Sequence, residues 1–364
     1  MTRFKTYALL LLFTLILGCS KDTVTIEDNE TATENNKLYF PPLNGAAWET
    51  LDMEALNWNS SAEAELHDFL EINDTKAFIV LKDGKIALEQ YFGNHTKDTP
   101  WYWASAGKTL TSFTTGIALQ EGFLALNDKT SDYLGVGWTS LTSDKEALIT
   151  IWHQLTMTSG MDDTQGDCKT PDCLTYMADA GTRWAYHNAP YTLIQNVVAN
   201  ATQTEFQDYF TSKVKNPIGM GGSWISSNGL NNVYWSTARS MARFGLLNLN
   251  KGNWNGTPVL ENTDYVSAMS NTSQDLNKSY GYLWWLNGKE SAMIPQSQEV
   301  FTTELIPNAP NDLYAGLGKN DQKLYIVPSQ NLVVVRMGQD TGYKALGPSG
   351  FDNELWGLLN EVMN

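Results

Sequence analysis

Ser105 and Lys108 are the two residues of this chain whose types and spacing suggest chemistry most directly. They stand three positions apart, immediately before a run in which Leu110, Phe113 and Ile117 recur at helical spacing. This spacing puts both side chains on one face of the first turn of a helix. A serine hydroxyl needs a base to become nucleophilic, and a desolvated lysine is neutral enough to serve. Backbone N–H groups at a helix start can stabilise an oxyanion. Ser105 is therefore a candidate acylating nucleophile.

Tyr186 and Asn188 form a second candidate group, in a segment expected to be a loop between helices. Tyr186 is the only tyrosine of the chain that is followed two residues later by asparagine. Its phenol could relay a proton, with a pKa lowered by the nearby ammonium of Lys108. Asn188 could hold Lys108 and the substrate by hydrogen bonds. The alternative is a tyrosine that is simply packed in a loop.

Gly316, Gly318 and Lys319 end an expected strand and form a third candidate group. Glycines in a strand mark the close approach of another backbone or of a ligand. The N–H of Lys319 could then be a second donor to an oxyanion. Taken alone, this stretch is equally consistent with a strand that ends in a turn.

The Ser-x-x-Lys pattern is weak by itself, because Ser212 and Lys215 repeat it before Asn216-Pro217, where no helix can continue. The copy at Ser105 differs in its context, with an expected hairpin upstream and an apolar helical run downstream. A Gly-x-Ser-x-Gly elbow is excluded because Trp103 stands where its first glycine would be.

The elements that must position these residues are strands near both ends of the chain and helices between them. Two apolar runs around Asp83-Gly84 predict a hairpin. Residues 124–134 are expected to form a loop. The pattern predicts one antiparallel sheet built from both chain ends, with an inserted helical region. Strands are expected over 78–81, 86–92, 282–286, 313–317, 323–327 and 332–337, and helices over 105–121, 149–158, 191–199, 206–214, 237–251 and 351–363.

The three groups, in this order, resemble the serine β-lactamase and DD-peptidase superfamily, specifically its class C-like branch of penicillin-binding-protein-related esterases and amidases. Ser105 with Lys108 matches the first motif of that family, Tyr186 with Asn188 matches the second, and the glycine strand falls where the third belongs. The resemblance implies a mixed α/β fold, an antiparallel sheet flanked by helices with an all-helical region, and an active site between them. Further segments that look like the family are 78–91, 154–160, 181–183, 236–239 and 281–285.

One departure from the family pattern concerns the substrate. Gly316 stands where the family commonly has lysine or histidine, a cation that usually helps to recognise a carboxylate of β-lactams or D-Ala-D-Ala-type peptides. Its absence looks like the branch near 6-aminohexanoate-dimer hydrolases and related carboxylesterases, which often end this strand with Gly-Gln, as Asp321-Gln322 partly does. Inefficient turnover of β-lactams is expected.

These observations predict a serine hydrolase that cleaves an ester or amide of a small molecule or peptide through an acyl-enzyme on Ser105. Lys108 and Tyr186 would exchange the proton, and neither a metal nor an organic cofactor is required. The alternatives are a DD-peptidase or β-lactamase, and a non-catalytic protein that binds cell-wall fragments on the same scaffold.

Residues 1–18 are expected to be a lipoprotein signal peptide, because Arg3 and Lys5 precede a short apolar run that ends at Gly18-Cys19. Cys19 would carry the lipid, residues 19–38 would form a disordered tether, and residues 39–364 would form the hydrolase domain. The alternative is an ordinary secretory signal with an incidental cysteine. A location in the cell envelope, periplasmic or surface-exposed, is expected, with contact to the membrane through the lipid anchor only.

The net charge of the chain limits the binding partners that it can have. The formal net charge is −16, and loss of residues 1–18 would make it −18. This balance argues against nucleic acid and anionic membrane surfaces as partners. The oligomeric state is not indicated.

The remaining candidates are two cysteines that could form a disulfide and two tryptophans that could line a cleft. In an oxidising envelope Cys168 and Cys173 favour a short disulfide loop, with two free thiols or half of a zinc site as the rival interpretations. A zinc site lacks further ligands nearby. Trp101 or Trp284 could line a substrate cleft, although aromatic residues at this density are more often part of the core.

Overall fold

Strands from both ends of the chain form one six-stranded sheet in the computed structural model, which describes residues 38–227, 231–343 and 349–364. The strand order is β2-β1-β11-β10-β9-β8, and every neighbouring pair is antiparallel. This confirms the predicted mixed α/β fold with a sheet from both chain ends. The expected signal peptide and Cys19 lie outside the described residues. The strands are β1 (Thr75–Lys82), β2 (Lys85–Tyr91), β8 (Trp285–Leu286), β9 (Tyr314–Gly318), β10 (Gln322–Val327) and β11 (Leu332–Gly338).

The hairpin of β1 and β2 turns at the predicted Asp83-Gly84 pair. Both residues have positive φ, 52° and 83°, which is the backbone conformation of the two-residue turn that suits twisted strands. Gly84 also lies where the carbonyl oxygen of Tyr39 would be 2.0 Å from an added Cβ. A side chain at position 84 would therefore displace the segment that precedes the sheet.

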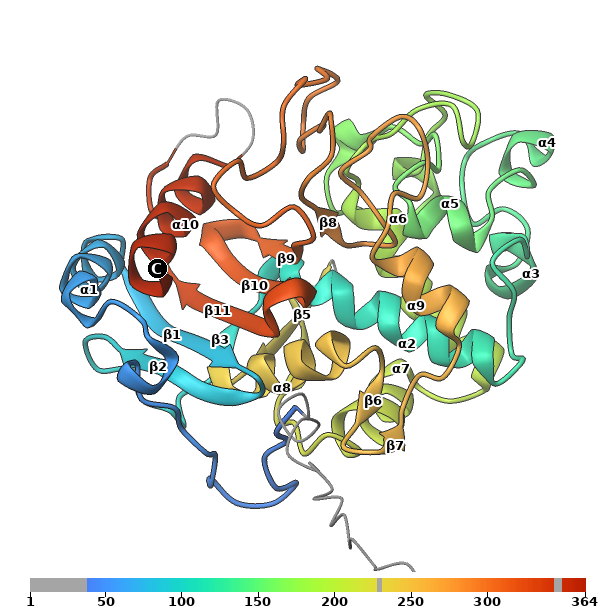
Figure 1. The fold of residues 1–364 in the computed structure, drawn as a ribbon. Coiled ribbons are helices and arrows are strands. Elements are labelled where there is room, and N and C mark those ends of the chain that lie inside the picture. The colour runs from blue at the N-terminus through green and yellow to red at the C-terminus, as the bar shows by residue number, and fades with distance from the viewer. Residues whose placement is uncertain (1–37, 228–230, 344–348) are drawn as a thin grey trace, which may run out of the picture. The chain divides into compact units, whose positions relative to one another are not determined.

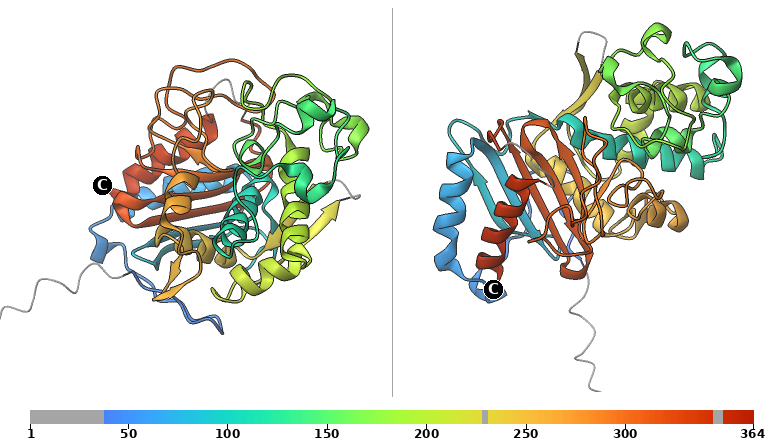
Figure 2. Two further views of the ribbon diagram at one scale, coloured as in Figure 1. Left: turned by 90° about the vertical axis from the view of Figure 1, so that its right-hand side faces the viewer. Right: turned by 90° about the horizontal axis from the view of Figure 1, so that it is seen from above.

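Helices cover both faces of the sheet. Figure 1 and the view from above in Figure 2 show α1 (Glu63–Ile72) and α10 (Gly350–Met363) on one face and α8 (Ala238–Leu249) on the other. Thr237 caps α8 by accepting a hydrogen bond from the N–H of Ser240. Gly245 lets α8 approach the sheet closely, because an added Cβ would lie 2.5 Å from the Val333 side chain.

A helical region lies beside the sheet and surrounds α2 (Lys108–Gln120), whose residues 108–118 are all buried. The predicted loop 124–134 contains the short helix α3, so that prediction was wrong at its C-terminal end. Packing against α6 stabilises this single turn, and no local sequence pattern predicts it. The other helices here are α3 (Thr130–Leu134), α4 (Ser143–Glu146), α5 (Ile151–Leu155), α6 (Asn188–Thr202), α7 (Phe206–Phe210) and α9 (Thr263–Met269).

A small second sheet, which the sequence analysis missed, lies next to the candidate nucleophile. It has the order β3-β5-β4 and consists of β3 (Trp101–Tyr102), β4 (Ser223–Ser227) and β5 (Asn231–Ser236). A two-stranded hairpin, β6 (Asn253–Trp254) with β7 (Thr257–Pro258), follows α8. The expected strand 282–286 shrinks to the two residues of β8.

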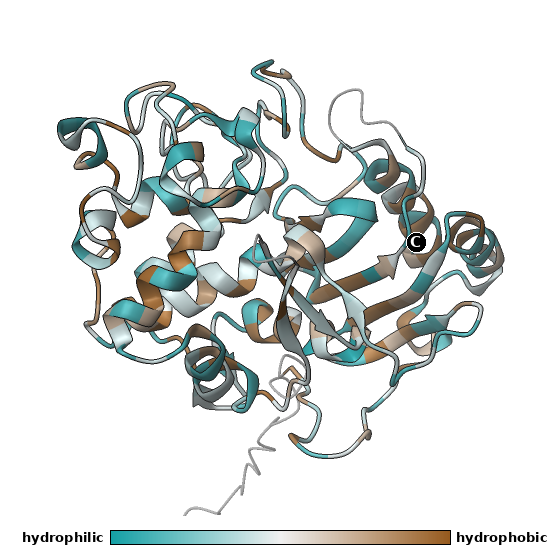
Figure 3. Ribbon diagram, turned by 180° about the vertical axis from the view of Figure 1, so that it is seen from behind, coloured by the Kyte–Doolittle hydropathy of each residue, from teal (hydrophilic) through white to brown (hydrophobic). Residues whose placement is uncertain are grey.

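The main hydrophobic core joins the sheet to the helical region, and a smaller cluster lies under the loop 161–175. Figure 3 shows hydrophobic residues gathered on the central strands, with hydrophilic residues along the peripheral loops. Within the described ranges, no helix is long and apolar enough to cross a bilayer. The small cluster comprises Trp138, Ile149, Met161, Leu174 and Ala189.

Candidate active site

Ser105 and Lys108 lie at the junction between a 3₁₀ turn and the central helix. Ser105 is in the turn η3 (Ala104–Gly107), and Lys108 is the first residue of α2. The Lys108 Nζ donates to the Ser105 Oγ over 2.9 Å. The expected helical start is thus a 3₁₀ turn that leads into the helix, and it brings the amine into contact with the hydroxyl.

The backbone before Ser105 is strained and held by the small sheet. Ala104 has a φ of +46°, a left-handed conformation that costs a non-glycine residue about 1 kcal/mol. The N–H of Trp103 donates to the carbonyl of Tyr234 over 2.8 Å, and its indole N–H donates to the Ser236 hydroxyl over 2.8 Å. These bonds to β5 hold the turn that presents Ser105.

Lys108 is buried, with 1% of its surface exposed. Its Nζ donates to the Asn188 Oδ1 over 2.7 Å and lies over the rings of Tyr186 and Tyr191, 4.7 and 4.1 Å from their centroids. Burial lowers the pKa of Lys108 to about 7, and the negative charge of Asp167 acts in the opposite direction. A lysine with this pKa is partly neutral near pH 7 and can accept the proton of the serine.

Tyr186 joins this group through a hydrogen bond with the Ser105 side chain. Its ring stacks on the ring of Trp285, with centroids 5.7 Å apart and planes at 20°. The expectation that its phenol pKa is lowered was wrong. Burial raises the pKa of Tyr186, and the hydrogen bond with Ser105 offsets this only in part. Tyr186 is therefore a neutral phenol, which can donate a proton.

Asn188 is oriented by a residue that the sequence analysis missed. Its Nδ2 donates to the Asp167 Oδ1 over 2.7 Å, while its Oδ1 faces Lys108. Asp167 precedes Cys168, which the structure joins to Cys173 in a disulfide with an S–S distance of 2.08 Å. No motif marks Asp167, because it is one of several acidic residues in a polar loop.

The two glycines of β9 allow this strand to lie against the turn that carries Ser105. A Cβ on Gly318 would lie 2.5 Å from the carbonyl oxygen of Trp103, and one on Gly316 would lie 3.1 Å from the Thr109 side chain. Gly318 and Lys319 line the same cavity as Ser105. This close approach is what glycine in a strand permits.

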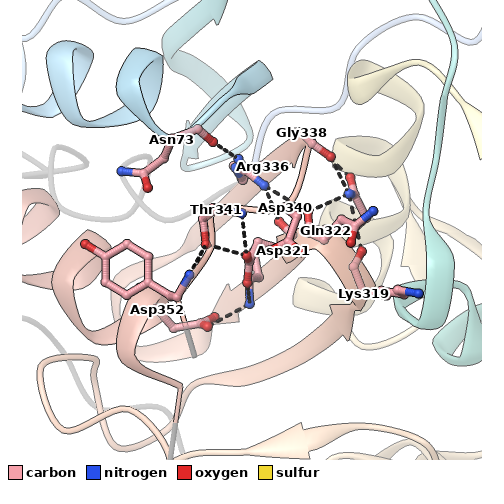
Figure 4. A network of polar contacts seen from close by, with 12 residues as sticks. Asn73, Lys319, Asp321, Gln322, Arg336, Gly338, Asp340, Thr341 and Asp352 are labelled. Atoms are coloured by element: carbon pink, nitrogen blue, oxygen red, sulfur yellow. Dashed lines mark hydrogen bonds and ion pairs between the residues drawn. The ribbon is translucent and has the colours of Figure 1, made fainter. Parts of the chain in front are cut away.

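The turn after β9 is held by a buried arginine. Asn320 and Asp321 both have positive φ, 60° and 57°. The Arg336 guanidinium donates to their carbonyl oxygens over 3.1 and 3.0 Å, and Gln322 donates to the carbonyl of Gly338 over 2.6 Å (Figure 4). These donors help to hold two non-glycine residues in the left-handed region, a conformation that persists only where the surrounding structure fixes it.

A cavity of about 770 Å³ opens in front of Ser105. Lys323 forms part of its wall, but its ammonium is paired with Asp321 at 3.1 Å and with Asp352 at 2.7 Å. The lining residues are Ser105, Asp163, Gly166, Asp167, Tyr186, Asn188, Trp285, Ile294, Pro295, Gln296, Leu305, Leu317, Gly318, Lys319, Lys323 and Ser349.

Neither tryptophan proposed for a cleft lines this cavity. Trp284 is fully buried and stacks on Phe244, so it belongs to the core. Trp101 lies in β3 and donates its indole N–H to the carbonyl of Gly338 over 3.1 Å. Trp285, the first residue of β8, lines the cavity instead.

His187, between Tyr186 and Asn188, is not among the residues that line the cavity. It is buried, neither ring nitrogen has a partner among the described residues, and burial lowers its pKa to about 4. Within the described part of the chain, no group of three or more histidine, cysteine or acidic side chains is placed to hold a metal ion.

Comparison with known proteins identifies the family of this chain. The β-lactamase family model matches residues 74–354. The chain belongs to the β-lactamase family. It is 24% identical to an uncharacterized protein of Alkalihalophilus pseudofirmus, over 85% of this chain and 94% of that protein.

Two solved structures share the fold. A protein of Bacillus anthracis, provisionally named a 6-aminohexanoate-dimer hydrolase, superposes with a TM-score of 0.67 and 18% identity, over 90% of each chain. A protein of Bacteroides dorei, provisionally named a β-lactamase, gives a TM-score of 0.65 and 17% identity, over 84% of this chain and 99% of that one. The resemblance to the serine β-lactamase and DD-peptidase superfamily is thereby confirmed, and the family supports a hydrolase in general.

Proposed function

We propose that this protein hydrolyses an ester or amide through an acyl-enzyme on Ser105. The observation that carries the proposal is the hydrogen-bonded chain from Ser105 to Lys108 to Asn188, with distances of 2.9 and 2.7 Å, at the wall of a 770 Å³ cavity. A nucleophile in contact with a base that a third group orients is the arrangement that acyl transfer requires.

The reaction follows from the protonation states of the site. Neutral Lys108 takes the proton of Ser105 while the Oγ attacks the carbonyl carbon. The backbone N–H groups of Ser105 and Lys319 stabilise the oxyanion. When the tetrahedral intermediate collapses, the leaving group takes a proton from Tyr186, and the Lys108 ammonium returns one to the phenol. Water then attacks the acyl-enzyme, and the same groups move its proton.

The glycine at position 316 favours an ester or amide over a β-lactam or a D-Ala-D-Ala-type peptide. Gly316 leaves no cationic side chain at the family position. Lys323 is a poor replacement, because Asp321 and Asp352 already balance its charge, and Lys319 in the cavity wall is the other cation that could take this role. Family membership keeps β-lactamase or DD-peptidase activity as the second candidate. Nitrocefin turnover comparable to ester turnover would favour that candidate.

The test is labelling by a fluorophosphonate probe together with hydrolysis of p-nitrophenyl butyrate. Ser105→Ala should abolish both. Ser212→Ala is the matched control, because Ser212 repeats the Ser-x-x-Lys pattern but bonds to the carbonyl of Tyr209. Labelling of Ser105→Ala at the wild-type level would refute the assignment, and inactivity of the wild type on a broad ester and amide panel would favour a non-catalytic binding protein.

We propose in addition that the protein is an envelope lipoprotein anchored through Cys19, as the signal pattern of residues 1–19 indicates. Mass spectrometry of the protein isolated from membranes should find a diacylglycerol-modified Cys19 at the N-terminus. An unmodified N-terminus downstream of Cys19 would show an ordinary secretory signal instead.

A further inference from the structure

We infer that Asp167 is a positioning residue for the Lys108 base, which it serves by orienting the Asn188 amide and by holding a negative charge beside the lysine. This inference rests on the proposed function of Ser105. It extends the candidate site into the loop 161–175, which contains none of the three motifs.

The hydrogen bonds have only one consistent direction. Asp167 as a carboxylate can only accept, so it takes the Nδ2 of Asn188 at 2.7 Å. The amide oxygen must then face Lys108, where it accepts from the Nζ at 2.7 Å. If the amide were reversed, two donor groups would face each other. Asp167 therefore determines which end of Asn188 meets the base.

The loop that carries Asp167 is built to hold it in place. Its two ends are joined by the bridge between Met161 and Tyr176, with the N–H of Asp162 donating to the carbonyl of Thr175 over 2.9 Å. Met161 and Leu174 are buried in the small hydrophobic cluster beneath the loop. The disulfide lies directly after Asp167. A single hydrogen-bonded carboxylate on such a loop has little freedom to leave Asn188.

The charge of Asp167 acts on Lys108 as well. It raises the pKa of the lysine against the larger effect of burial. Removing the charge while keeping the hydrogen bond should therefore leave Lys108 neutral down to lower pH. The other titratable groups around the pair are the phenols of Tyr186 and Tyr191 over Lys108, the groups Asp162, Asp163, Arg183 and His187 around the loop, and Lys319 and Lys323 in the cavity wall.

Two variants separate the two roles. Asp167→Asn keeps an oxygen acceptor for Asn188 but removes the charge, and Asp167→Ala removes both. The readout is the rate at which a fluorophosphonate probe labels Ser105 between pH 5 and 9, which needs no knowledge of the substrate. Asp167→Asn should keep the high-pH plateau within a few-fold and shift the acid limb to lower pH. Asp167→Ala should lower the plateau about 10- to 100-fold, as expected for the loss of a charge-assisted hydrogen bond.

Asp172→Asn is the matched control, since it removes the same charge from the same loop 161–175 at an exposed position. Its pH profile should match that of the wild type. An acid limb for Asp167→Asn identical to that of the wild type would overturn the inference, even if Asp167→Ala were slow, because that pattern marks a merely structural role. Thermal unfolding of each variant identifies a folding defect. Ser105→Ala tests the proposed function independently.

Discussion

The titration of Lys108 gives the most direct test of the mechanism, because the structure predicts both its midpoint and its sign. With a pKa of about 7 for this buried amine, about one half of the molecules carry a neutral base at pH 7. The fraction falls to about one tenth at pH 6 and about one hundredth at pH 5. The value of kcat/KM should therefore fall tenfold per pH unit below 7 and level off above 8.

The assay is hydrolysis of p-nitrophenyl butyrate between pH 5 and 9, with the Ser105→Ala rate subtracted at each pH as background. Lys108→Met should lose at least about 100-fold in kcat, the size of a general-base contribution. A wild-type profile that is flat between pH 5 and 9 would show that Lys108 is not the base, and one that keeps rising to pH 9 would show that the pKa of the base is not lowered to about 7. Either result would refute the reasoning from burial.

The same pKa predicts a pH-dependent stability. A lysine with a pKa of 10.5 when unfolded and about 7 when folded binds more protons in the unfolded state between these two pH values. The free energy of unfolding of the wild type, relative to Lys108→Met, should therefore rise between pH 7 and 10.5, by about 5 kcal/mol in total. Urea unfolding at pH 7 and 10 checks this, and a constant difference would contradict it.

Three variants, the last with two substitutions, test the elements that hold the site. Gly318→Ala should destabilise the protein by about 1–3 kcal/mol and slow Ser105 labelling, because its Cβ would lie 2.5 Å from the Trp103 carbonyl oxygen; unchanged labelling and melting temperature would contradict the close approach. Arg336→Met should cost about 3–5 kcal/mol of unfolding free energy, since it leaves the backbone carbonyls of Asn73, Asn320, Asp321 and Gln339 without their donor; a loss below 1 kcal/mol would show that the turn is stable without the arginine. Replacing Cys168 and Cys173 by Ser should cost about 2 kcal/mol, measured by urea unfolding. This pair of changes should also slow Ser105 labelling, and an unaltered labelling rate would show that the disulfide does not help to hold the site.

The main sheet could be predicted because its strands are local patterns. The hairpin around Asp83-Gly84 and the strands near the C-terminal end combine alternating or continuous apolar runs with recognisable turns. The small sheet of β3, β4 and β5 was missed. Its strands are short, and β4 follows a glycine-rich stretch that indicates a turn. Pairing between distant segments makes these residues strands, so no local pattern marks them.

The prediction that Trp284 lines a substrate cleft was wrong by a single residue. Trp284 and Trp285 are adjacent and chemically identical, and only the direction that each side chain takes in the fold decides which of them faces the cavity. The short β8 gives no alternation from which that direction can be read.

The sequence by itself determined which groups can do chemistry, because Ser105, Lys108, Tyr186 and Asn188 stand in short motifs of distinctive spacing. It also predicted that strands from both chain ends form one sheet, because the hydrophobic pattern marks most of these strands. Only the tertiary structure decided the protonation states and the support of the site. Burial lowers the pKa of Lys108 and raises that of Tyr186, and burial is the sum of contacts from distant segments. The role of Asp167 also depends on the tertiary structure, because only the fold places the Asn188 amide 2.7 Å from this carboxylate of a polar loop.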